Sequence, residues 1–150
     1  MTLSGKEVLA YQSAIADLPA GKKLADAMNK LSDGAFNVAF QVSGEVSNVV
    51  TVTIDVTGPD GQALSTPTLL EFLMVNNSTT FVPSSTDYTT IAATTGSVLE
   101  VTADRFLKVL TNAAGRAVLT FTLASGAATN FLAFIRPGGS LVASPAIVHV

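Results

Sequence analysis

Two different spacings of apolar residues divide the chain near residue 35. In residues 1–34 the apolar positions recur every three or four residues, which places them on one face of a helix. Ser4 and Glu7 fit a capping box, Pro19 ends the first stretch, and Asp33 and Gly34 end the second. The pattern predicts a short helical hairpin whose apolar stripes are Val8, Tyr11, Ile15 and Leu18, then Leu24, Met28 and Leu31.

From residue 35 onward the apolar spacing changes to two, which is typical of strands with one buried face. Alternation is clearest in the segments 36–42, 46–58 and 116–124, and further strand candidates are 68–76, 131–135 and 140–150. Turn signals built from glycine, proline and asparagine separate several of these segments. Residues 76–90 read as a polar loop, and residues 98–110 alternate so weakly that they fit a strand or a helix. The absence of intervening helical patterns favours an antiparallel β-sandwich over parallel βαβ units.

Charge is scarce and unevenly spread. Charged residues make up 13% of the chain and hydrophobic residues 48%, whereas a typical domain has about 25% charged residues. Residues 1–34 hold 8 of the 19 charges, so 11 remain for the other 116 residues. We therefore expect the second region to self-associate into a homo-oligomer. The net charge of −3 without a basic cluster argues against nucleic-acid binding, and no apolar run approaches the roughly 20 residues of a membrane span.

Two segments carry a resemblance to a known family. VTVTIDVTGPDGQAL at 50–64 resembles the strand and turn that open many bacterial immunoglobulin-like domains, and LTNAAGRAVLTFT at 110–122 is similar to a second recurrent segment of that family. The resemblance implies a mainly β protein. It would have an immunoglobulin-like antiparallel β-sandwich at 35–150, with its core at 46–150, after the N-terminal helical docking segment at 1–34.

The arrangement as a whole resembles small virion structural proteins of tailed bacteriophages, of the head decoration (cement) or head-fibre type. That resemblance implies a non-enzymatic role in the virion, after assembly in the host cytoplasm, with the major capsid protein or other virion proteins as partners. The N-terminus also lacks the apolar core of a secretory signal. A neck or tail structural protein is an alternative. A second alternative is an immunoglobulin-like binding module that recognises a glycan or a host surface through the loop 76–90.

Candidate chemistry is sparse, so we expect no catalytic, cofactor-binding or metal-binding residues. The chain has no cysteine, and its single histidine, His149, is expected to face outward on a terminal strand. Asp55 and Asp60 flank a turn, and Glu100 and Asp104 are four residues apart. Paired carboxylates can hydrolyse glycosides, but turn formation and solvation explain these four more simply. No glycine-rich phosphate loop occurs.

The interface candidates are the seven residues of the two helical stripes and three residues of the polar loop. Phe81 and Val82 precede Pro83 in that loop, where they would either pack against the loop itself or contact a partner. Tyr88 is expected mainly to anchor the loop on the rim of the sandwich, with glycan stacking as the alternative.

Overall fold

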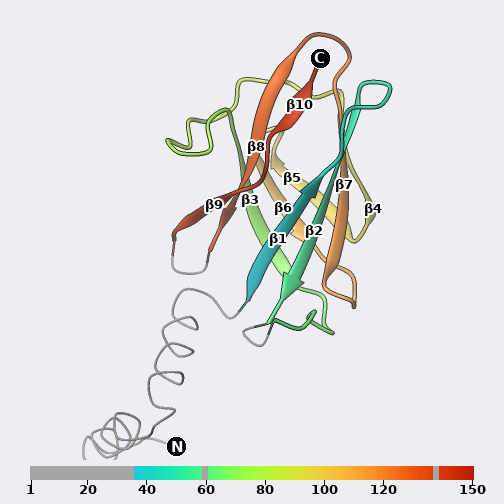
Figure 1. The fold of residues 1–150 in the computed structure, drawn as a ribbon, viewed down its shortest axis with the longest axis vertical. Helices are drawn as coiled ribbons and strands as arrows, with labels where there is room; N and C mark the ends of the chain where they lie inside the picture. The colour runs from blue at the N-terminus through green and yellow to red at the C-terminus, as the bar shows by residue number, and fades with distance from the viewer. Residues whose placement is uncertain (1–35, 59–60, 137–138) are drawn as a thin grey trace, which may run out of the picture.

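The computed structural model describes residues 36–58, 61–136 and 139–150, and its regular elements there are all strands (Figure 1). Ten strands form two antiparallel sheets, so the expectation of a mainly β protein is confirmed. The predicted helical hairpin lies outside the described residues, and so do its interface candidates, which are Val8, Tyr11, Ile15, Leu18, Leu24, Met28 and Leu31.

The first sheet has four strands in the order β1-β2-β7-β4. Its members are β1 (Asn37–Val42), β2 (Val49–Thr57), β4 (Thr90–Thr95) and β7 (Arg116–Thr122). The three segments with the clearest alternation are strands of this sheet. The β1 strand pairs with β2 along its whole length, so the sandwich begins before residue 46. β4 was not predicted, because only Ile91 among its residues is a large apolar side chain.

The second sheet has the order β10-β8-β3-β6-β5, with β9 also pairing β8. Its members are β3 (Leu69–Val75), β5 (Ser97–Thr102), β6 (Phe106–Leu110), β8 (Ala128–Ile135), β9 (Leu141–Ala143) and β10 (Ile147–His149). The ambiguous segment 98–110 is a hairpin of β5 and β6, joined by a turn in which Asp104 has a φ of 57°. β9 and β10 share the same edge of β8, separated by Ser144, Pro145 and Ala146.

A single glycine links β4 of the first sheet to β5 of the second. β4 ends at Thr95 in the first sheet and β5 begins at Ser97 in the second, so the chain changes layers at Gly96. Gly96 has a φ of 76°, a backbone angle that residues other than glycine rarely adopt. A Cβ atom there would lie 2.4 Å from the carbonyl oxygen of Leu110. The layer change therefore depends on the absence of a side chain at this position.

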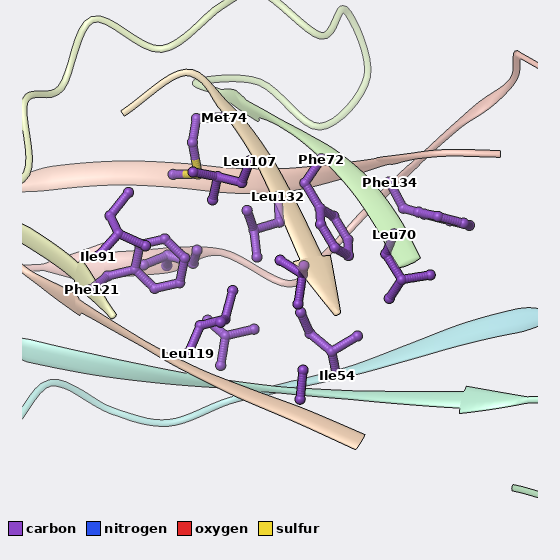
Figure 2. Packing of buried hydrophobic residues seen from close by; sticks show 14 of the residues in the cluster. Ile54, Leu70, Phe72, Met74, Ile91, Leu107, Leu119, Phe121, Leu132 and Phe134 are labelled. Atoms are coloured by element: carbon purple, nitrogen blue, oxygen red, sulfur yellow. The ribbon is translucent and has the colours of Figure 1, made fainter. Parts of the chain in front are cut away.

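The hydrophobic core lies between the two sheets (Figure 2). Alternate residues of β2, β3, β6 and β7 point inward, as the two-residue period requires. In the first sheet these include Val52, Ile54, Leu119 and Phe121, and each of them is fully buried. The second sheet contributes a facing set that includes Leu70, Phe72, Met74, Leu107, Leu132 and Phe134. The period seen in the sequence therefore assigns the inner faces of β2 and β7 correctly.

The expected outward orientation of His149 is wrong. Its side chain is 2% exposed, and its Nε2 atom lies 3.2 Å from the carbonyl oxygen of Phe121 in the other sheet. Pro145 interrupts the final segment, and the alternation restarts at Ile147, which is also buried. His149 is two residues further on and so shares the inner face, whereas Val148 is 41% exposed.

Candidate interaction surface

The outer face of the first sheet is polar. Outward positions of the paired strands β2 and β7 carry Thr51, Thr53, Thr120 and Thr122. At one end of this face the Arg116 guanidinium binds the carboxylate of Asp55, with an Nε–Oδ1 distance of 2.7 Å. Asp55 therefore has a structural partner on an open sheet surface. This outer face is well suited to contact with water.

The outer face of the second sheet is apolar, and this difference between the two faces is the main functional feature of the sandwich. Leu99 is 63% exposed, Leu69 57%, Val101 50% and Leu110 41%. Half-buried Leu73, Phe106, Phe131 and Ile135 continue the same face, which we call the apolar face. Contiguous exposed apolar surface is uncommon on proteins that act alone and marks contact sites.

One ion pair lies at the centre of the apolar face. Lys108 on β6 and Glu71 on β3 are direct neighbours across the strands, and Nζ lies 3.1 Å from Oε1. The Lys108 side chain is 36% exposed and the Glu71 side chain 42%. Residues paired side by side across neighbouring strands form a row. In the row of this ion pair, Leu99 on β5 lies next to Lys108. Ile135 on β8 lies next to Glu71, because Phe134 pairs with Phe72 and the antiparallel register continues by one residue.

Two shallow hollows shape the apolar face. One, with a volume of about 300 Å³, is lined by residues that include Leu73, Phe106, Phe81 and Pro83. The other, of about 280 Å³, lies over β5 and β6 and is lined by residues that include Leu69, Leu99 and Leu110. Their linings are mainly apolar, so both favour apolar side chains of a partner over a polar substrate.

The polar loop 76–90 has two parts with different roles. Its first half folds on itself, because the side-chain oxygen of Asn77 accepts hydrogen bonds from the backbone N–H groups of Thr79 and Thr80. Phe81 adopts a φ of 51° and is half-buried, with its side chain lining the larger hollow, while Val82 is 47% exposed. Phe81 therefore extends the apolar face, and Val82 presents apolar surface beside it.

The second half of the loop is anchored inside the sandwich by Asn130. Asn130 is 1% exposed, and its side-chain amide donates hydrogen bonds to the hydroxyls of Thr86 and Tyr88. Its oxygen accepts a 2.6 Å hydrogen bond from Ser84. Tyr88 is 7% exposed and packs edge-on against the rings of Phe121 and His149. The interpretation of Tyr88 as a loop anchor is confirmed, and its buried ring offers no platform for a glycan.

Burial raises the pKa of Tyr88 to about 12, against an ordinary value of 10.0. The unfolded chain loses this proton first, so the stability linked to Tyr88 is present below pH 10 and is lost as the pH rises toward 12. We expect a loss of about 2–3 kcal/mol over that interval from this residue. Urea unfolding at several alkaline pH values measures this loss as the slope of the free energy of unfolding against pH, and Tyr88→Phe should make that slope shallower. Equal slopes for the wild type and Tyr88→Phe would show that Tyr88 is not the source of the pH dependence.

The paired carboxylates at the β5–β6 turn support the backbone. The Glu100 carboxylate accepts a hydrogen bond from the backbone N–H of Asp104 at 2.9 Å. The Asp104 carboxylate accepts one from the backbone N–H of Tyr88, and burial raises its pKa above the ordinary value despite that bond. Arg105 completes the turn by donating to the Thr86 carbonyl oxygen and to Asp87. These groups tie the turn to the loop 76–90, and Arg105 also lines the hollow formed by Leu73, Phe81 and Phe106. Asp60 lies outside the described residues.

Among the described residues, no three or more metal-ligating side chains are grouped so that they could hold a metal ion. No helix in that part of the chain combines the length and apolarity needed to cross a membrane. No protein-family model and no curated protein matches the sequence.

Sequence reasoning missed most of the apolar face. The exposed residues Leu69, Leu99, Val101 and Leu110 were not among the interface candidates. For Leu99, Val101 and Leu110 the signal was available in the segment 97–110, and for Leu69 in the segment 68–76. In both segments apolar residues occupy neighbouring positions and so cannot all point to one side of a strand. A strand that is apolar on both faces needs a second partner for its outer side.

Proposed function

We propose that the protein is a non-enzymatic structural protein of a phage virion, a decoration or cement protein that binds the outside of the head and stabilises it through subunit contacts. The observation that carries the proposal is the one-sided sandwich, with an apolar outer face on the second sheet and a threonine-rich outer face on the first. A subunit bound to a shell needs one surface that contacts the neighbouring proteins and another that is exposed to water. The segment 1–34 would supply attachment to the major capsid protein.

The order of the strands supports an immunoglobulin-like assignment of the sandwich. In immunoglobulin domains, one sheet has the order A-B-E-D and the other G-F-C with two further strands in variable-type domains. Here β1-β2-β7-β4 and β10-β8-β3-β6-β5 occupy the equivalent places. The connections differ, because β4 precedes β5 and β6 along the chain, whereas the equivalent immunoglobulin strand D follows the two added strands.

Purified particles test the proposal most directly. Phage particles isolated on a density gradient from cells that carry this gene should contain the chain, at a copy number that is a fixed ratio of the major shell protein. A variant that lacks residues 1–34 should remain folded, by circular dichroism, and should be lost from the particles. If the full chain stays at the top of the gradient while intact particles sediment, the proposal is wrong.

A further inference from the structure

We propose that the apolar face is the interface of a twofold dimer, in which β3 of one copy lies over β6 of the other. The inference deepens the proposed structural role, because it names a second copy of the chain as the occupant of the contact surface. It concerns purified protein alone, so its failure and the failure of particle binding are separate results.

The central strands of the apolar face are complementary to each other row by row. β3 and β6 pair in the register Leu69 with Leu110, Glu71 with Lys108, and Leu73 with Phe106. These six side chains alternate with the core residues of the two strands and so point away from the core. Each row therefore holds either two apolar side chains or two opposite charges.

This register selects one symmetry axis. A twofold axis in the interface, parallel to the strands and midway between β3 and β6, places each β6 residue over the β3 residue of the same row in the second copy. Lys108 then faces Glu71 of the second copy, and the reverse contact follows by symmetry. A twofold axis perpendicular to the strands would instead place Lys108 over Lys108 and Glu71 over Glu71, which is repulsive.

The flanking strands fit the same axis. In the row of the ion pair, Leu99 on β5 and Ile135 on β8 lie at equal distances on either side of the pair. The rotation places Leu99 over Ile135 of the second copy, so apolar side chains surround the four alternating charges. Two twisted sheets pack this way with their strands about 30° apart.

The size of the apolar face sets the expected affinity of the dimer. Four strands at a spacing of about 4.8 Å, each contributing about five residues at about 3.4 Å per residue, make a face of roughly 20 Å by 17 Å with three outward-facing rows. That is smaller than the roughly 800 Å² per partner of a stable complex. We therefore expect a concentration-dependent dimer that forms in the micromolar range or above.

A charge swap tests the proposed axis. Sedimentation velocity of the full chain should show dimer formation as the concentration rises from micromolar toward millimolar. Glu71→Lys places two lysines in each central row and should weaken the dimer by about tenfold or more. The double variant with Glu71→Lys and Lys108→Glu restores opposite charges within its own dimer. It should therefore pair with itself and fail to pair with the wild type, measured by energy transfer between fluorescently labelled chains.

The matched control lies on the opposite outer face, where Asp55→Arg combined with Arg116→Asp swaps a similar ion pair. This control should pair freely with the wild type. The inference is overturned if the wild type stays monomeric over the whole range. It is also overturned if the Glu71 and Lys108 swap exchanges with the wild type as well as with itself. A preference of the swap for the wild type would overturn it too, since that result requires the perpendicular axis.

Discussion

Replacing Phe72 by alanine should destabilise the sandwich by about 3–5 kcal/mol, the largest effect expected from a single truncation. Phe72 is fully buried, and its ring lies 6.0 Å from that of Phe40 and 5.7 Å from that of Phe134, by centroids. It thus joins the first sheet to the second. A typical domain is stable by about 5–15 kcal/mol, so the variant would lose a large share of its stability.

Urea unfolding followed by circular dichroism measures the loss, because the chain has no tryptophan to report on folding. The control is Phe131→Ala, which removes an aromatic ring from the half-buried outer side of β8. Its cost in the free energy of unfolding should be about 1–2 kcal/mol, because part of that ring is already exposed to water. If the two variants were equally destabilised, the core would not lie between the sheets as described.

Gly96→Ala should cost about 3 kcal/mol or more in the free energy of unfolding. Two physical effects add at this position. The positive φ of 76° strains any residue with a Cβ atom, and that atom would meet the Leu110 carbonyl oxygen at 2.4 Å and the Cβ of Ala117 at 3.3 Å. Because Leu110 and Ala117 belong to strands of different sheets, relief of the clash must move one sheet against the other.

The matched variant is Gly126→Ala, whose φ of 92° is also positive but whose Cβ would meet nothing within 4 Å. It should cost only about 1 kcal/mol, from backbone strain. Thermal unfolding of both variants separates the two effects. A Gly96→Ala variant as stable as the Gly126→Ala variant would show that the layer change at residue 96 is not tightly packed.

The sequence predicts the inner face of the sandwich better than its connections. Val52, Ile54, Leu119 and Phe121 are buried where the two-residue period places them, because burial of one sheet face imposes that period directly. β4 escaped prediction because its residues are mainly alanine and threonine, which give little contrast between its faces. The order of β4, β5 and β6 depends on one glycine conformation at Gly96, which a hydrophobic pattern does not encode.

The sequence predicts that the sandwich has a contact surface, but it does not predict most of the residues that form that surface. Low charge in residues 35–150 favours self-association through the sandwich, and the structure places the exposed Leu69, Leu99, Val101 and Leu110 on strands of the second sheet. Of the three loop candidates, Phe81 lines a hollow of that surface, Val82 is exposed beside it, and Tyr88 is buried. His149 was assigned to the wrong face, because the break at Pro145 resets the alternation of the last strand. The complementary rows of β3 and β6 require the register between strands far apart in sequence.

In the proposed dimer, a second copy of the chain covers the apolar face of the second sheet and places Leu99 over Ile135. One cross-linking measurement tests this, because the chain has no cysteine of its own. Chains with Leu99→Cys are mixed with chains carrying Ile135→Cys, in the presence of a short bismaleimide that spans about the 10 Å between packed sheets. We predict cross-linked dimers that join one chain of each kind, and little product from either variant alone. Equal cross-linking in the mixture and in the separate variants, or none at all, would contradict the account.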